Sequence, residues 1–229
     1  MSKMKAQTLV DKAVDIAKNY KTLYVMGCFG APMMAENKTR YTQNHAYNKQ
    51  AARTAMIKAA TADTFGFDCV NLIKGILWGW CGDASKRYGG ATYPTAAMFA
   101  AGACPDVGAD GMIAKCTGVS TTGWASMVPG EAVWLSGHIG IYIGDGLAVE
   151  SSPAFANKVQ ITAVANIGKK AGYSARTWTK HGKIPWVDYT GAVAGGSAPV
   201  VSQPTQPDTN AQGPAVGAVV AFTGIQHYT

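Results

Sequence analysis

The chain has 229 residues, of which 48% are apolar and 14% are charged, with six Trp, ten Tyr and six Phe. Such a composition supports a buried core and excludes a disordered or coiled-coil chain. Lys and Arg outnumber Asp and Glu by 20 to 13, and the resulting net charge of +7 favours contact with a polyanion such as nucleic acid, a membrane surface or the wall of a bacterium.

The sequence also argues against a membrane span, a secretory signal, a disulfide framework and a metal site. Asp68 and Lys74 interrupt the most apolar stretch, residues 65–82, so no segment has the roughly 18 apolar residues of a membrane span. Residues 1–7 lead into an amphipathic pattern, so no secretory signal is expected. The five cysteines are an odd number without a Cys-x-x-Cys pair, and the four histidines lie far apart. We therefore expect neither a complete disulfide framework nor a metal or other cofactor.

Hydrophobic periodicity predicts helices first and strands afterwards. Helical spacing of apolar residues recurs over three segments: 6–20, 49–60 and 69–80. Asp68 precedes the third segment as its expected N-cap. Short alternating runs then predict antiparallel strands over 131–135, 138–143 and 147–151. This order indicates an α+β fold.

The composition changes after Val193. Residues 194–216 are mostly small or polar, with Asp208 as the single charged residue and no aromatic one, so we expect a flexible linker. Residues 217–229 alternate briefly and are too few for a domain. The expected organisation is therefore a main domain over 1–193, a linker, and the start of another module.

Cys69 is the candidate nucleophile. It falls on the first turn of the third predicted helix, where unpaired backbone N–H groups and the helix dipole favour a thiolate. The other four cysteines are expected to be small buried side chains: Cys28, Cys81, Cys104 and Cys116.

The strand over 138–143 is expected to place a histidine opposite the core. Its isoleucines alternate with His138, Gly140 and Tyr142, so His138 lies on the face that the isoleucines avoid. The register of the following hairpin then decides which residue lies beside His138.

Burial favours a three-residue hairpin loop over 144–146. This loop joins the apolar stripes of both strands by pairing Ile143 with Leu147 and Ile141 with Val149. A two-residue loop is expected to break both faces. In the favoured register Glu150 lies opposite Gly140 and diagonal to His138, so Glu150 and His138 are expected to touch. A thiol, an imidazole and a carboxylate are the groups needed for acyl transfer.

Three segments resemble the NlpC/P60 superfamily of peptidoglycan peptidases, which is close to the CHAP amidases: Phe67-Asp68-Cys69-Val70-Asn71-Leu72, Pro129-Gly130-Glu131, and Gly137 to Gly144. The order and spacing of these segments match the family, and the resemblance covers roughly residues 9–189. The resemblance implies a papain-like fold, with N-terminal helices packed on a small antiparallel sheet, and catalytic roles for Cys69, His138 and Glu150. Residues 144–155 are similar to endolysins of phages that infect Gram-positive bacteria, and residues 217–229 resemble the start of an SH3-like wall-binding module.

Tyr24 falls in a segment, Leu23-Tyr24-Val25-Met26-Gly27, that resembles the family's Tyr-Val-x-Gly motif. The resemblance implies that Tyr24 binds the oxyanion or orients Cys69, and a half-buried aromatic without a role in catalysis is the alternative. The long separation of Tyr24 from Cys69 implies an insertion over residues 32–62 that borders the cleft. Glu150 stands where the family more often has His, Asn or Gln, and a carboxylate accepts from an imidazole N–H at least as well as an amide.

The remaining polar and aromatic residues are first given structural roles. His181 lies in a basic stretch and is expected in a solvated loop. Four aspartates lack the spacing of a calcium loop and are expected in turns: Asp83, Asp106, Asp110 and Asp145. All six tryptophans are expected in the core, with a substrate groove as the alternative for Trp124, Trp134, Trp178 and Trp186. Anionic wall polymer is the expected partner of a basic group: Lys169, Lys170, Arg176, Lys180 and Lys183.

The sequence thus predicts a cysteine peptidase domain that hydrolyses an amide bond in the peptide part of peptidoglycan. Cys69 attacks, His138 transfers the proton and Glu150 orients His138. The expected partners are peptidoglycan and anionic wall polymers, not nucleic acid, and the protein is expected to be made in the host cytoplasm and to act on the wall after release. Two alternatives stay open: a thiol acyltransferase of transglutaminase type, and a noncatalytic wall-binding module in which Cys69 is merely buried.

Overall fold

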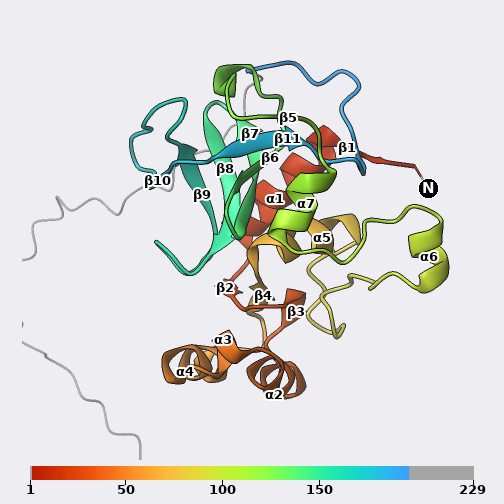
Figure 1. Cartoon of the computed structure of the whole chain (residues 1–229). Helices are drawn as coiled ribbons and strands as arrows, with labels where there is room; N and C mark the ends of the chain where they lie inside the picture. The colour runs from red at the N-terminus through yellow and green to blue at the C-terminus, as the bar shows by residue number, and fades with distance from the viewer. Residues whose placement is uncertain (1, 196–229) are drawn as a thin grey trace, which may run out of the picture. The chain divides into compact units, whose positions relative to one another are not determined.

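Two helices of the N-terminal half cover one face of a large sheet built by the C-terminal half (Figure 1). The structure is a computed structural model that describes residues 2–195. Apart from Ala194 and Gly195, the expected linker and the expected module over 217–229 lie outside the described residues. Within residues 2–195 no helix is both long enough and apolar enough to cross a membrane.

Two of the helices build the core beneath the sheet. Helix α1 (Ala6–Asn19) follows the short strand β1 (Met4–Lys5), and α5 (Cys69–Leu77) has the apolar stripe that the sequence predicts. Side chains of α1 and α5 form one buried cluster with Ile139, Ile141 and Ile143. Helix α5 ends at Leu77, three residues before the predicted end at Trp80, because Gly79 has a positive φ of 87° that helical backbone does not allow.

The expected insertion is helical. It contains α2 (Ala35–Asn44), α3 (Ala46–Lys49) and α4 (Ala51–Ala59), where the sequence predicts only one helix. These helices flank a small sheet in the order β2–β4–β3, from β2 (Thr22–Tyr24), β3 (Phe29–Pro32) and β4 (Phe65–Phe67). Strand β4 leads directly into α5. Two short helices, α6 (Ala96–Ala100) and α7 (Ala109–Lys115), follow α5.

The main sheet has seven strands in the order β10–β9–β8–β7–β6–β11–β5 and curls in space (Figure 1). Its strands are β5 (Thr117–Ser120), β6 (Ala132–Leu135), β7 (His138–Gly144), β8 (Leu147–Ser152), β9 (Lys158–Val164), β10 (Ala175–Arg176) and β11 (Lys180–Lys183). A single 3₁₀ turn (Trp124–Ser126) lies between β5 and β6, and β12 (Val187–Asp188) pairs with β1. The α+β class is confirmed. The sheet is larger than the small antiparallel one expected, and it is mixed because β10 runs parallel to β9.

The loop of the hairpin between β7 and β8 is shorter than predicted, but the predicted pairing of the two strands is retained. The loop has two residues, Asp145 and Gly146, and Gly144 rather than Ile143 pairs with Leu147. A bulge between Tyr142 and Gly144 restores the expected pairing of Ile141 with Val149. The bulged strand therefore keeps both apolar stripes on the core face, which the sequence argument assigned to a longer loop.

The opposite face of the sheet is also covered. A second buried cluster forms there from Met127, Val133, Tyr142, Ala148, Val164 and Trp178. His138 consequently lies at the edge of a packed layer, with 13% of its side chain exposed, instead of on an open polar face.

Candidate active site

Asp68 fixes the start of the helix that carries Cys69. Its carboxylate accepts from the backbone N–H of Asn71 at 2.8 Å, as expected of an N-cap, and from the backbone N–H of Gly27 at 2.7 Å. Burial raises the pKa of Asp68 in spite of these hydrogen bonds. The same side chain therefore caps α5 and holds the loop after Tyr24 against it.

Cys69 lies beside the turn that precedes His138. The Cys69 Sγ is 4.0 Å from the carbonyl oxygen of Gly137, and the residue is 7% exposed. Burial, reinforced by the nearby Asp68 carboxylate, raises the pKa of the Cys69 thiol to about 12. The expectation of a thiolate favoured by the helix start is therefore wrong for the resting site, because desolvation outweighs the effect of the helix terminus.

The expected contact between His138 and Glu150 is confirmed. The Nε2 of His138 lies 2.7 Å from a carboxylate oxygen of Glu150, whose side chain is fully buried. Trp178 stacks on the other side of the histidine, with ring centroids 5.5 Å apart and an angle of 8° between the planes. Gly140 leaves room for this indole, since a Cβ there would lie 3.2 Å from Trp178.

Glu150 has two further partners that the sequence argument did not identify. The Nε of Arg176 is 2.8 Å from both carboxylate oxygens, and the hydroxyl of Thr162 donates to one of them at 2.8 Å. Burial works to raise the pKa of Glu150, but the hydrogen bonds from His138 and Arg176 outweigh it and leave this pKa below its usual value. Glu150 is thus an ionised acceptor. This assigns the hydrogen to His138 Nε2 and leaves Nδ1 to exchange a proton with a reacting group.

A cavity of about 660 Å³ opens over Cys69. Tyr24, Cys69 and Gly137 line it, and so do Arg40 and His45 from the inserted helices. Residues of the segment 32–62 therefore border the cavity as expected, and its description as an insertion stays a prediction. Cys69 and Gly137 line this cavity, whereas His138 is not among its lining residues.

Tyr24 lines the same cavity and is more deeply buried than a half-buried aromatic, with 5% of its surface exposed. Its hydroxyl lies 3.9 Å from the sulfur of Met26, and the guanidinium of Arg53 lies 5.6 Å from the ring centroid. Burial, and to a lesser degree Cys69, raise the pKa of the phenol. Tyr24 therefore stays a hydrogen-bond donor at neutral pH, and its part in catalysis stays a prediction.

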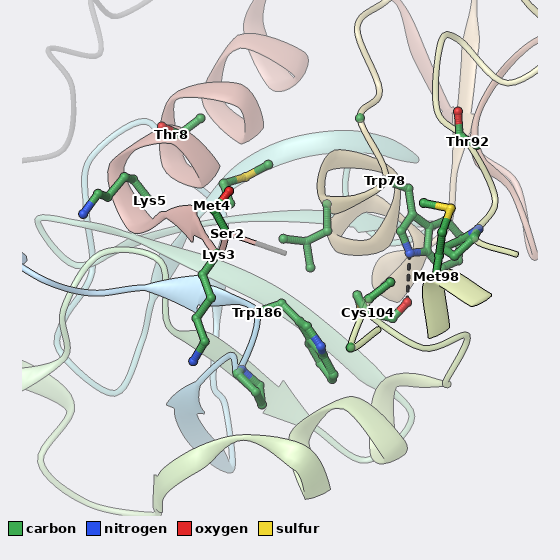
Figure 2. A pocket seen from close by; sticks show the side chains of 16 residues that line it. Ser2, Lys3, Met4, Lys5, Thr8, Trp78, Thr92, Met98, Cys104 and Trp186 are labelled. Carbon is green, nitrogen blue, oxygen red and sulfur yellow. Dashed lines mark hydrogen bonds between the residues drawn. The ribbon is translucent and has the colours of Figure 1, made fainter. Parts of the chain in front are cut away.

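A second cavity, of about 760 Å³, lies between the N-terminal residues and the loop around α6 (Figure 2). Trp78 and Trp186 contribute to its wall, and the indole N–H of Trp78 donates to the carbonyl of Cys104 at 3.0 Å. None of the predicted catalytic residues lines it. The smaller cavity at Cys69 is therefore the candidate active site.

The expectation that His181 lies in a solvated loop is wrong. It lies on β11 and is 7% exposed, with Nδ1 at 2.7 Å from Glu131 and Nε2 at 2.8 Å from the carbonyl oxygen of Thr122. The pairing of β11 with both β5 and β6 buries the residue. Both ring nitrogens are occupied, so this histidine has a structural role here.

Three members of the expected basic group contact other side chains of this protein. Arg176 contacts Glu150 in the sheet, Lys170 pairs with Asp145 at 2.7 Å, and Lys180 lies over the ring of Trp134. Asp110 has a more specific place than a turn, because it accepts from the backbone N–H of Gly137 and from the indole of Trp134, both at 2.9 Å.

The other cysteines differ in their exposure. Cys28 and Cys104 are buried as expected, whereas Cys116 is partly exposed and Cys81 is exposed, so the expectation of burial is wrong for Cys81. All five thiols are free. In the described part of the chain, no group of three or more His, Cys, Asp or Glu side chains has an arrangement that holds a metal ion.

Comparison of the chain with known protein families, with curated proteins and with solved structures gives no match. The class that the fold and site define is a mixed α+β protein with a buried cysteine at a helix start, beside the turn that precedes a histidine. A buried glutamate contacts this histidine, and an arginine contacts the glutamate.

Proposed function

We propose that this chain is a papain-like cysteine peptidase or amidase that cleaves an amide bond in the peptide part of bacterial peptidoglycan, as a phage endolysin does. The observation that carries the proposal is the site geometry. Cys69 begins α5 beside the Gly137 turn, and the next residue, His138, is held by Glu150 at 2.7 Å. The resemblance to NlpC/P60 peptidases supports the choice of substrate, and the net charge of +7 suits an anionic wall.

The reaction starts from a neutral thiol, because burial keeps Cys69 protonated. As the sulfur bonds to the carbonyl carbon, the thiol proton moves to His138 Nδ1 and the carbonyl electron pair moves onto oxygen. Collapse of this intermediate breaks the carbon–nitrogen bond, and the leaving amine takes the proton from His138. Water then attacks the thioester, gives its proton to His138 and releases the acid, and the proton returns to Cys69.

The groups around Cys69 suit the developing oxyanion. Residues at the start of α5 line the cavity, and the first N–H groups of a helix have no acceptor within it. Tyr24 lines the same cavity as a neutral phenol that can donate a hydrogen bond. Substrate enters from the cavity of about 660 Å³, whose far wall belongs to the inserted helices. We therefore assign Tyr24 an oxyanion-binding or orienting role.

The test compares Cys69→Ser and His138→Ala with Cys81→Ser on purified peptidoglycan. Loss of the nucleophile or of the base should lower turnover by about 10³ or more while the protein stays folded. Cys81→Ser is the matched control because Cys81 is exposed and does not line the cavity. Mass spectrometry of the products identifies the bond that is cut. Unchanged release of new amines by Cys69→Ser ends the peptidase proposal.

One observation favours a second candidate, the noncatalytic wall-binding module. A buried cysteine with a raised pKa is typical of an inert thiol, and Cys69 has both properties. In that case wild type and Cys69→Ala bind walls equally and neither releases amines. An acyltransferase is distinguished in the same assay, since it incorporates an added amine instead of releasing an acid.

A further inference from the structure

We propose that Arg176 is a positioning residue of this site: its guanidinium holds Glu150 in the single orientation in which that carboxylate fixes His138. The inference rests on the proposed function for its catalytic consequence, but its geometric part concerns only the three side chains. The sequence argument placed Arg176 among basic residues that contact a wall polymer. The structure instead assigns it to the interior of the site.

The guanidinium contacts Glu150 and its own sheet at the same time. Nε donates to both carboxylate oxygens at 2.8 Å, and Nη2 donates to the hydroxyl of Ser152 at 3.1 Å. The Arg176 side chain is 16% exposed and that of Glu150 is fully buried. An arginine supplies several donors in one rigid plane, which a lysine cannot reproduce.

Aromatic rings fix the guanidinium from the side. Its central carbon lies 5.0 Å from the ring centroid of Phe155 and 5.6 Å from that of Trp178. Trp178 also stacks on His138. Arg176 therefore reaches the imidazole by two routes, through the carboxylate of Glu150 and through the indole of Trp178.

The charges explain why this contact affects catalysis. A buried carboxylate needs a positive partner, and Arg176 supplies it. The imidazole of His138 is then free to be neutral, with its hydrogen on Nε2 toward Glu150 and its lone pair on Nδ1. Without Arg176, the other described side chain that contacts Glu150 and can carry a positive charge is His138, and an imidazolium cannot accept a proton from Cys69.

Few other titratable groups face this pair. Strand β10 contributes Arg176, β9 contributes the neutral hydroxyl of Thr162, and α5 contributes the protonated thiol of Cys69. Helix α7 contributes the carboxylate of Asp110, which accepts from the backbone N–H of Gly137, the residue before His138. Tyr24, from β2, is a neutral phenol at physiological pH. Among these groups Arg176 is the cation in direct contact with Glu150, so the balance of charge around that carboxylate depends on it.

The kinetic experiment measures kcat, KM and their pH dependence on soluble peptidoglycan fragments for wild type, Arg176→Ala and Arg176→Lys. Arg176→Ala should lower kcat by about 10- to 100-fold with little change in KM. The acid limb of the pH–kcat profile of Arg176→Ala should move to higher pH. Millimolar ethylguanidinium should restore part of the rate of this variant. Arg176→Lys keeps the charge without the planar fork, so it should fold and give an intermediate rate.

The matched control is Arg87→Ala, which removes an exposed arginine paired with Glu36 at 2.8 Å. It should leave the rate and the pH profile unchanged. If Arg176→Ala melts like wild type and has the pH profile of Arg87→Ala, the proposal is wrong. If Arg176→Ala does not fold, Arg176→Lys decides, since a wild-type rate and profile in that variant contradict the need for the guanidinium plane.

A spectroscopic measurement separates this inference from the proposed function. Nitrogen NMR of His138 in the Cys69→Ala background should show a neutral ring protonated on Nε2 in the presence of Arg176, and an imidazolium that persists to higher pH in Arg176→Ala, which loses the positive charge. The same spectra in both variants overturn the positioning role. If the spectra change as expected but wild type does not hydrolyse peptidoglycan, the proposed function fails and the positioning role stands.

Discussion

At the scale of single residues, the surroundings of Glu150 leave little room for substitution. Its two oxygens accept hydrogen bonds from three side chains on three strands: His138 on β7, Thr162 on β9 and Arg176 on β10. An isolated His–Glu pair, which is what the sequence predicts, tolerates an amide in place of the carboxylate. A carboxylate surrounded by donors does not.

Glu150→Gln should therefore lose almost as much activity as Glu150→Ala. One half of the amide is an NH₂ group, which must face a donor of His138, Thr162 or Arg176 and cannot accept from it. Both variants leave the charge of Arg176 without its partner, at a cost of about 3 to 5 kcal/mol in unfolding free energy. Chemical denaturation and the hydrolysis assay check both effects.

A double variant provides the control for Glu150. Arg176→Met removes the unpaired charge, so Glu150→Gln with Arg176→Met should be more stable than Glu150→Gln alone. Additive losses would show that the two side chains do not interact, in disagreement with their separation of 2.8 Å.

The protonation of Cys69 is a second property of a single residue that can be measured. The pKa of its thiol is raised to about 12, so the thiolate fraction at neutral pH is small and should grow about tenfold per pH unit. Alkylation of Cys69 by iodoacetamide in His138→Ala should rise over the whole range from pH 7 to the onset of unfolding. Peptide mass spectrometry distinguishes Cys69 from the exposed Cys81. A plateau near the ordinary thiol pKa would contradict the burial of the sulfur.

At the scale of elements, sequence patterns predict the helices and the hairpin well because burial is local and periodic there. The helix at Cys69 follows from the helical spacing of apolar residues, and Asp68 precedes it as its cap. The pairing of Ile141 with Val149 follows from the alternation of apolar residues along the strands. The length of the hairpin loop was not predicted correctly, because a bulge at Ile143 adds a residue to the strand while the apolar residues stay on the same face of the sheet. Pattern arguments fix the faces of a strand more firmly than the number of residues in its turn.

Long-range pairing explains what the sequence does not predict. Arg176 and His181 lie in short strands whose burial comes from neighbours distant in the chain: β9 beside β10, and β5 and β6 around β11. A run of basic residues gives no sign of such neighbours. The sequence gives a weak indication of the role of Thr162. Because Thr162 alternates with Ile161 and Ala163, it is expected on the polar face of β9.

The turn of the hairpin gives a prediction at this scale. Asp145 has a φ of 48° and Gly146 a φ of 68°, and positive values at both positions are typical of a two-residue hairpin turn. Gly146→Ala should lower the unfolding free energy by about 1 kcal/mol, since a Cβ there is strained and would also lie 3.3 Å from Lys170. Thermal unfolding measures the change.

Asp145→Asn is the matched variant in the same turn. Asn also tolerates a positive φ, and the variant loses only an exposed ion pair with Lys170, so its stability should change by less than about 1 kcal/mol. If the two variants are equally destabilised, the turn conformation is not the cause.

At the scale of the whole molecule, the described residues are sufficient for the candidate site. Helices α1 and α5, strands β7 and β8, and the small sheet with Tyr24 contribute to the buried clusters and to the cavity over Cys69. Gly195, the last described residue, donates its backbone N–H to the carbonyl of Met127 at 3.2 Å. The composition of residues 194–216 separately predicts a linker.

A chain that ends at Gly195 should therefore keep the melting temperature and the rate on soluble peptidoglycan fragments of the whole chain. Its rate on intact walls should stay equal or fall, because any wall affinity supplied by residues 196–229 raises the local concentration of the enzyme at an insoluble substrate. Calorimetry and the two hydrolysis assays measure these quantities separately. Limited proteolysis provides the independent check, with the first cleavage expected between Ala194 and Val216 and the released core still active on soluble fragments. A shorter chain that unfolds more easily or loses the soluble activity would show that residues 196–229 belong to the catalytic domain, against the boundary expected at Val193.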